Sequence, residues 1–258
     1  MIGEIAQQIN IFVMVLARVL GIIMLSPVFS SRNIPPQLKI GLSAIVSLTV
    51  FPVLKAGGLR TPDDIISYSL LVMGEVAVGL MIGFVSNFLF SAIQLAGQAI
   101  DMQLGFSIVS VIDPIQGTQV PIIGNFKYIV ALLIFLVTNS HYYIFAAIVK
   151  SFQLIPILTY TYHPALTDQV ISFFGGTLVT AVKIALPAVG VLLVTDVAMG
   201  ILARTVPQMN IFVVGMPLKI FVGLIVLMLA FPLYGFMLKV FFDNSFADLM
   251  KLMKAMGG

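Results

Sequence analysis

The 258-residue sequence contains no cysteine and few charged residues, and these two absences exclude several kinds of protein. Without cysteine, the chain can form neither disulfide bonds nor thiolate metal sites. Only 9% of its residues are charged, against about 25% in soluble domains, whereas 60% are hydrophobic and the mean hydropathy is +1.14. The apolar runs are continuous rather than alternating, so the sequence predicts an all-α integral membrane protein and not a β-barrel.

Motifs that carry catalysis are also absent from the sequence. It contains no H-E-x-x-H, P-loop or G-x-S-x-G pattern, and its two histidines, His141 and His163, have no carboxylates at metal-binding spacing. The basic residues are scattered and the net charge is only +3, which gives no indication of nucleic-acid binding. The N-terminus does not resemble a secretory signal, because Glu4 stands where basic residues are needed. We expect neither an enzyme nor a metal or cofactor site.

One long helix dominates the expected structure. From Glu75 to Gly105, small and polar residues recur about every 3.75 positions, close to the helical repeat of about 3.6. Such a helix is about 45 Å long, which exceeds a hydrocarbon core of about 30 Å. The polar stripe could pack closely against another helix, or part of it could face water in a channel. The stripe comprises Glu75, Gly79, Gly83, Asn87, Ser91, Gln94, Gln98, Asp101 and Gly105.

The segment that follows, residues 105–125, is apolar but poorly suited to a helix, because it is rich in glycine, proline and β-branched residues. Non-helical backbone in a membrane must be buried in protein or line a cavity. The segment could be an ordinary re-entrant connection, or it could be a flexible plug that swings on its glycines and seals a pore with apolar side chains. The residues of this plug loop are Gly105, Phe106, Ser107, Ile108, Val109, Val111, Ile112, Asp113, Pro114, Gly117 and Gly124.

Other apolar segments predict further helices. Ile9 to Phe29 carries an arginine near its middle, which must be paired, snorkelled or facing water. Phe126 to Val149 has the pattern of a single span, and two more apolar runs follow at Val170 to Ala203 and Leu218 to Phe242. Residues 243–258 have the amphipathic pattern of a helix at the membrane interface, and their basic residues favour a cytoplasmic C-terminus.

A set of motifs resembles one protein family over essentially the whole chain. The motifs are the first helix with Arg18, Pro35-Pro36-x-Leu-Lys39, Gly74-Glu75-x3-Gly79-x3-Gly83, Gln94-Leu-Ala-Gly97-Gln98-x2-Asp101-x-Gln103-x-Gly105-Phe-Ser107, and Asp113-Pro114. Together they are similar to the FliR/SctT family of type III protein export. The run from Gly74 to Pro114 is the specific part of the resemblance.

The resemblance implies a pore-forming subunit of the flagellar export gate, without catalysis of its own. In that family, one copy assembles with FliP and FliQ subunits and associates with FlhB in the bacterial inner membrane, at the flagellar basal body. Unfolded export substrates would pass through the shared pore. The implied organisation is a FliP-like region at 1–155 with the long helix at 74–104 and the plug loop at 105–125, a linker at 156–168, a FliQ-like hairpin at 169–242, and an amphipathic tail at 243–258.

Polar residues would join this subunit to its surroundings. If the chain is an export-gate subunit, we expect hydrogen bonds to neighbouring helices or to the plug loop from Glu75, Gln98 and Asp101. The candidates for charged contacts between subunits are Arg18, Lys39, Lys183, Asp196, Arg204 and Lys219.

An alternative function is that of a secondary transporter with a polar site at the membrane midplane. Seven of the fifteen residues at 38–52 recur with the same spacing at 218–232, and internal repeats are common in transporters. That site would be built from Arg18, Glu75, Asp101, Lys183 and Asp196.

Overall fold

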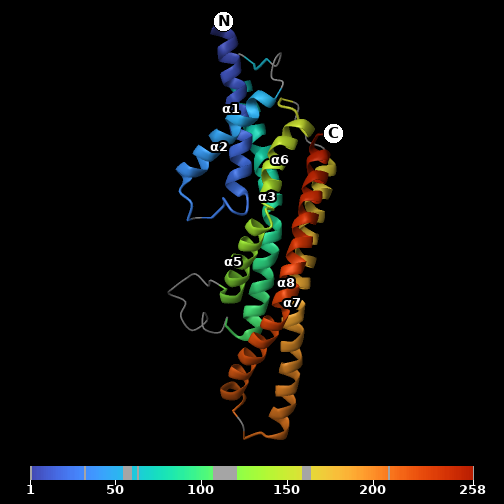
Figure 1. The fold of residues 1–258 in the computed structure, drawn as a ribbon. Coiled ribbons are helices and arrows are strands. Elements are labelled where there is room, and N and C mark those ends of the chain that lie inside the picture. The colour runs from blue at the N-terminus through green and yellow to red at the C-terminus, as the bar shows by residue number, and fades with distance from the viewer. Residues whose placement is uncertain are drawn as a thin grey trace. The chain divides into compact units, whose positions relative to one another are not determined.

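The secondary structure is helical throughout the part of the chain that can be described. A computed structural model describes residues 2–31, 33–54, 60–62, 64–106, 121–158, 164–208 and 210–257. Within these ranges there is no β-strand (Figure 1), and the prediction of an all-α integral membrane protein is confirmed. The helices are α1 (Ile2–Leu25), α2 (Pro36–Val50), the 3-10 turn η1 (Phe51–Val53), α3 (Ile65–Leu104), α5 (Ile122–Val137), α6 (Tyr142–Leu154), α7 (Pro164–Thr205) and α8 (Ile211–Gly257).

Five of the described helices are long and apolar enough to cross a membrane, and the broken pair α5–α6 would add a sixth span. Helices α3, α7 and α8 have 40, 42 and 47 residues. At about 1.5 Å per residue they are about 60–70 Å long, roughly twice the hydrocarbon core. Each of them must therefore tilt, bend or extend beyond the lipid.

Two compact units make up the fold. Unit 1 contains Met1–Phe88, Asn139–Phe174 and Asp243–Gly258, and unit 2 contains Leu89–Thr138 and Gly175–Phe242. Because α3, α7 and α8 each contribute to both units, the units do not follow chain order. The implied division into a FliP-like region and a FliQ-like hairpin does follow chain order, and it stays a prediction.

Helix α3 begins ten residues before the polar stripe, at a cap made by Asp64. Its Oδ2 accepts hydrogen bonds from the backbone N–H and the hydroxyl of Ser67, both at 3.0 Å. Its carbonyl accepts the N–H of Tyr68 at 3.0 Å, which starts the helical ladder. The two bonds from Ser67 stabilise the carboxylate and hold the pKa of Asp64 below its ordinary value.

The single span expected at Phe126–Val149 is broken in the structure. Helix α5 ends at Val137, and α6 begins at Tyr142. Between them Asn139 adopts a left-handed conformation with a φ of 57°. Asparagine tolerates this conformation better than most residues do, and a single left-handed residue ends a right-handed helix. The apolar composition on both sides concealed this break.

The C-terminal part of α8 continues that helix and packs inside unit 1. The ring of Phe246 stacks on Tyr143 of α6, with the ring centroids 4.6 Å apart. A side chain at Gly257 would collide with the carbonyl oxygen of Leu154, at the end of α6. The apolar face of this segment is buried, whereas Lys251 is exposed. The amphipathic pattern therefore fits packing against protein, and the expected place at the membrane interface stays a prediction.

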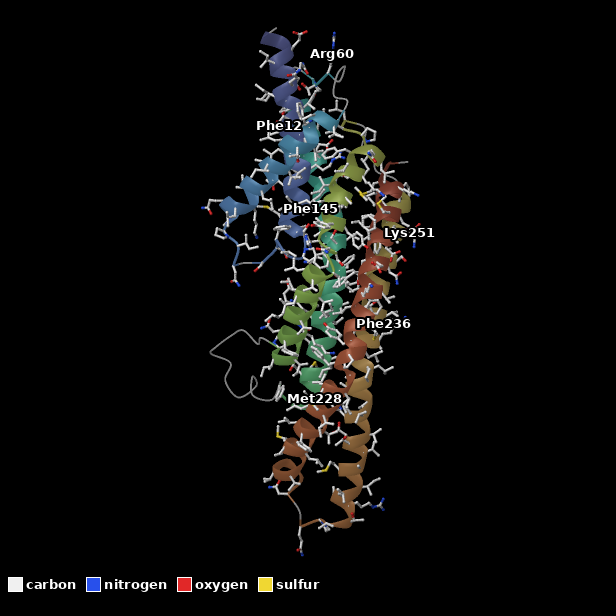
Figure 2. All side chains as sticks on the ribbon, viewed as in Figure 1. Phe12, Arg60, Phe145, Met228, Phe236 and Lys251 are labelled. Atoms are coloured by element: carbon white, nitrogen blue, oxygen red, sulfur yellow. The ribbon has the colours of Figure 1, made fainter. Side chains whose placement is uncertain are left out.

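Unit 2 combines a small aromatic core with a largely exposed apolar hairpin. Phe90 of α3 lies 5.6 Å from Phe135 and 6.0 Å from Phe242, measured between ring centroids. In α8, by contrast, only 11% of the most apolar window is buried, against 56% in α3. Met228 and Phe236, which are labelled in Figure 2, are 72% and 69% exposed. The hairpin therefore presents large apolar faces that no described residue of this chain covers.

Candidate functional site

The most deeply buried charge in the described residues is Arg18, in the middle of α1. Its Nε donates to Glu75 Oε2 at 2.5 Å. Its Nη1 donates to the carbonyl oxygens of Ser151 and Ile155, at 3.1 and 2.7 Å. The guanidinium carbon lies 4.4 Å from the ring centroid of Phe152. Arg18 thus joins α1, α3 and the C-terminal end of α6, where the helix dipole favours a positive charge.

The arrangement around Arg18 is that of a structural tie. The second oxygen of Glu75, Oε1, accepts the N–H of Leu158 at 3.4 Å. Nη2 of Arg18 is buried and has no hydrogen-bond partner among the described residues. A buried ion pair of this kind adds little net stability compared with apolar residues, but loss of one partner leaves an uncompensated charge. The pair therefore fixes which helices meet here.

Glycines bring α1 and α3 into backbone contact next to this ion pair. A side chain at Gly79 would collide with the carbonyl oxygen of Arg18. A Cβ atom at Gly83 would lie 2.7 Å from the carbonyl oxygen of Ile22, and Gly21 stands on the α1 side of the same contact. Small residues at four-residue spacing permit this close approach between membrane helices. In this part of the stripe, the small residues serve helix packing.

Farther along α3 the stripe changes character. Asn87 is half-buried, whereas Gln94 and Gln98 are exposed. Leu95 and Met102, which share this side of the helix by their spacing, are exposed too. An amide-bearing face thus runs along the second half of α3 without cover from the described residues of unit 2.

Asp101 closes the stripe and binds the start of the next helix. Its carboxylate is buried and accepts the backbone N–H groups of Ile123 and Gly124, at 3.0 and 3.1 Å. These are the second and third residues of α5, whose amides have no acceptor within their own helix. The negative charge also suits the positive end of the α5 dipole. Asp101 is therefore a cap supplied from another helix.

The backbone carbonyl of Asp101 binds the N-terminal end of the plug loop. It accepts the N–H of Phe106 at 3.0 Å, while the N–H of Gly105 bonds to the Met102 carbonyl at 3.1 Å. With a φ of 87° at Gly105, this is a Schellman motif, which ends α3. One residue thus binds both flanks of the segment 107–120 through its carbonyl and its carboxylate. We call the three hydrogen bonds that Asp101 accepts from Phe106, Ile123 and Gly124 the Asp101 clasp.

The expected plug loop is only partly described. Phe106 is half-buried. Gly124, expected in the loop, lies in the first turn of α5, where its Cα would collide with a side chain at Gly97. Gly105 lies in the cap of α3, and the expectation that the loop swings on its glycines stays a prediction. The remaining plug residues, Ser107, Ile108, Val109, Val111, Ile112, Asp113, Pro114 and Gly117, lie outside the described residues.

Two of the candidate charges form an ion pair inside unit 2. Lys219 Nζ lies 2.7 Å from Asp196 Oδ1, and Gln103 Nε2 donates to Asp196 Oδ2 at 2.7 Å. The pair connects α8 and α7, and Gln103 adds α3. These two charges therefore have partners within the chain.

The other candidate charges are less engaged. Lys39 Nζ donates to the carbonyl of Ser31 at 3.1 Å. Lys183 and Arg204 are exposed on α7 and make no hydrogen bond or ion pair with any described residue. These two remain available for contacts outside the chain. No group of three histidine, aspartate or glutamate side chains that could hold a metal ion occurs in the described ranges.

The sequence analysis missed two features of the polar framework. One is the approach of Gly97 to Gly124, although Gly97 stands one residue before Gln98 in the stripe. The other is Lys127, which is almost fully buried, and whose ammonium nitrogen lies 4.8 Å from the ring centroid of Tyr234. No local pattern signals either contact, because both join residues that are far apart in the chain.

Comparison with known proteins reveals similarity along nearly the full length. The family described as "Bacterial export proteins, family 1" matches residues 9–245. "Flagellar biosynthetic protein FliR" of Bacillus subtilis (strain 168) is 34% identical over 251 residues, which cover 95% of each chain. The protein of the same name from Escherichia coli (strain K12) is 29% identical over 255 residues, covering 95% of this chain and 92% of that one. The protein of this name from Aquifex aeolicus (strain VF5) is 25% identical over 235 residues, covering 91% and 89%.

Proposed function

Because the chain belongs to the bacterial export proteins, family 1, we propose that it is a pore-forming subunit of the flagellar type III export gate. In this role it helps to line and to plug a channel for unfolded export substrates. Its partners in the gate are FliP, FliQ and FlhB. The gate lies in the bacterial inner membrane at the flagellar basal body, with the C-terminus of this chain in the cytoplasm.

The observation that supports the proposed plug is the Asp101 clasp. A segment that blocks a pore must be long enough to move, and its ends must stay in place while it does so. Residues 107–120 meet the second requirement, because both flanks are hydrogen-bonded to Asp101. Gly105 follows the end of α3, and Pro121 precedes the start of α5. A glycine and a proline thus mark the boundaries of the two helices next to this segment. The clasp thus supports a tethered plug.

Two uncovered faces support the role in lining and assembly. The exposed amides Gln94 and Gln98 on α3 provide a polar surface for the conduit. The exposed apolar faces of α7 and α8 need lipid or equally hydrophobic subunits as neighbours. Lys183 and Arg204 on α7 would then pair with acidic groups of those subunits.

Catalysis has no part in this proposal. The buried carboxylates of Glu75 and Asp101 both serve structural contacts, one with Arg18 and one with the amides of α5. A general base needs a position within reach of a substrate proton, and these carboxylates are closed off by their partners.

The described part of the chain offers no observation in favour of the transporter alternative. That function needs five charged residues to form a common polar site. Instead, Arg18 binds Glu75 within unit 1, while in unit 2 Asp101 binds backbone amides and Asp196 is paired with a lysine. Lys183 makes no hydrogen bond or ion pair with these groups and is exposed. Each polar residue thus has its own local partner or none.

Deletion of the plug segment tests the proposal. Residues 107–119 are replaced by a short Gly-Ser linker in cells that express the complete gate, and ion conductance across the membrane is measured. A matched control keeps residues 107–119 in shuffled order, which preserves their length and composition. Co-purification of the partner subunits verifies assembly of each variant. We expect increased conductance from the deletion and a smaller increase, or none, from the shuffled segment.

The outcome that contradicts the plug is a gate that assembles with the deletion and conducts ions as the wild type does. If instead no unlike hydrophobic subunits co-purify with the wild-type chain, the assignment to a hetero-oligomeric gate is wrong as well.

A further inference from the structure

Unit 2 contains an apolar cavity to which the proposed function assigns no role. Its volume is about 650 Å³, within the range of about 300–1,000 Å³ that is typical of ligand sites. It lies between α5, α7 and α8, and its walls include Phe126, Ile184, Pro187, Leu224, Met228 and Phe231. Helices α7 and α8 are long and apolar enough to cross a membrane, and α5 would do so together with α6. The surroundings of this cavity are therefore hydrocarbon or other apolar protein.

Prolines explain why the helices leave space here. Pro187 of α7 and Pro232 of α8 both line the cavity and both stand inside a helix. Each proline lacks the N–H of one intrahelical hydrogen bond, and its ring takes up space against the preceding turn. The cavity thus lies beside a proline in each helix of the hairpin.

A lysine without an anionic partner lines the otherwise apolar wall. Lys127 of α5 is only 8% exposed, and its Nζ has neither an ion pair nor a hydrogen bond with any described residue. Its one neighbour of note is the ring of Tyr234, whose centroid lies 4.8 Å from Nζ. The Tyr234 hydroxyl donates to the Lys127 carbonyl at 2.9 Å, which fixes the ring beside the lysine. A negative charge nearby would stabilise a buried ammonium in apolar surroundings.

We infer that this cavity binds an anionic phospholipid, with an acyl chain against the apolar wall and a phosphate oxygen at Lys127. The apolar walls suit hydrocarbon and exclude a soluble anion, because such an ion would lose its hydration without polar replacement. Basic pockets between membrane helices are known to hold anionic head groups. The lysine supplies the charge, and Tyr234 supplies its position. This inference does not depend on the plug, although Ile123, whose N–H belongs to the Asp101 clasp, also lines the cavity.

Photolabelling of the purified gate tests the inference. The probe is phosphatidylglycerol with a diazirine on one acyl chain, and the labelled residues are located by mass spectrometry. Competitors are unlabelled phosphatidylglycerol, phosphatidylcholine with the same acyl chains, and inorganic phosphate. In the wild type we expect label on the α8 segment 224–228, displaced about fivefold better by phosphatidylglycerol than by phosphatidylcholine. Inorganic phosphate should not displace it.

Three variants distinguish the effect of the Lys127 charge from the effect of the cavity volume. Lys127→Met keeps an apolar stem of similar length, and we expect it to abolish the preference for phosphatidylglycerol while labelling continues. Ala230→Phe fills the cavity and should abolish labelling; if this variant fails to assemble, the Lys127→Met comparison still decides. Lys239→Met is the matched control, because it removes an exposed lysine of the same unit that does not line the cavity. This control should behave as the wild type.

Two outcomes overturn the inference. One is equal displacement by the two phospholipids in the wild type, which would remove the role of Lys127. The other is a photoreactive residue at position 126 that crosslinks a partner subunit instead of lipid, which would make the cavity a protein-protein contact.

Discussion

Replacement of Asp101 by alanine should loosen the start of α5 and leave the rest of the helix in place. In the wild type, the buried carboxylate is the acceptor for the N–H groups of Ile123 and Gly124. The first amides of a helix have no internal acceptor, and both residues are buried, so water cannot easily replace the carboxylate. Alanine at position 101 therefore leaves two donors unsatisfied.

The size of the effect follows from these two donors. A buried donor without an acceptor costs about 1–3 kcal/mol, and the lost interaction with the helix dipole adds about 0.3–1 kcal/mol. Relaxation of the backbone toward water would recover part of this sum, which leaves about 2–3 kcal/mol for local opening. With 1.4 kcal/mol per factor of ten, opening of the first turn becomes about 30- to 140-fold more frequent. Asp101→Asn retains one acceptor oxygen, and we expect a smaller increase of about 5- to 10-fold.

Hydrogen exchange measured by mass spectrometry checks this prediction. Peptides that cover residues 121–128 are compared between the wild type and the variants in the solubilised gate. Exchange of native amides reports the frequency of local opening, so the rate for residues 122–124 should rise by the factors given above. Gln98→Ala is the matched control, because Gln98 lies on the same helix but is exposed. Equal exchange in Asp101→Ala and Gln98→Ala would refute the capping role of Asp101.

Three further substitutions test the packing around the stripe. Arg18→Met should lower the free energy of unfolding by about 3–5 kcal/mol, because it leaves the buried carboxylate of Glu75 unpaired. Adding Glu75→Gln to this variant should restore more than half of the loss. Denaturant titrations of the purified chain measure both effects. Gly79→Ala should lower the same free energy by about 1–3 kcal/mol, since its methyl group meets the α1 backbone. Gly41→Ala, with no atom within 4 Å of its Cβ, should cause no such loss, because alanine favours a helix interior more than glycine does. Gly97→Ala should separate α3 from α5 and speed hydrogen exchange at the start of α5, whereas unchanged exchange would mean that the contact is absent in solution.

The fold class and most helices were predictable because composition and periodicity are local properties. A charged fraction of 9% with long apolar runs indicates membrane helices, and the 3.75-residue spacing indicates one long helix after Glu75. The break at Asn139 was not predicted, although an asparagine between Thr138 and Ser140 inside an apolar run was a local signal for it. The prediction of one span followed the apolar composition instead, because the segments before and after the asparagine are both apolar and helical.

The partners of the stripe were not predictable from the sequence, because they depend on contacts between distant residues. Glu75 and Asp101 both form hydrogen bonds with other elements, and their partners lie 57 and 22 residues away in the chain. Gln98 has the same spacing along the helix and yet is exposed. The spacing of residues along the chain predicts which of them share a side of a helix, but it does not predict what packs against that side.

The two acids of the stripe have a common physical role that explains how a broken span stays in place. A break between α5 and α6 creates two short helices, and their outer ends need partners outside the pair. Asp101 places a negative charge at the N-terminus of α5, while Glu75 holds Arg18 at the carbonyls that end α6. Each charge has the sign that the helix dipole at that end favours. Reversal of either sign, as in Asp101→Lys, should therefore be more harmful than neutral replacement, and equal effects would show that hydrogen bonding alone fixes these ends.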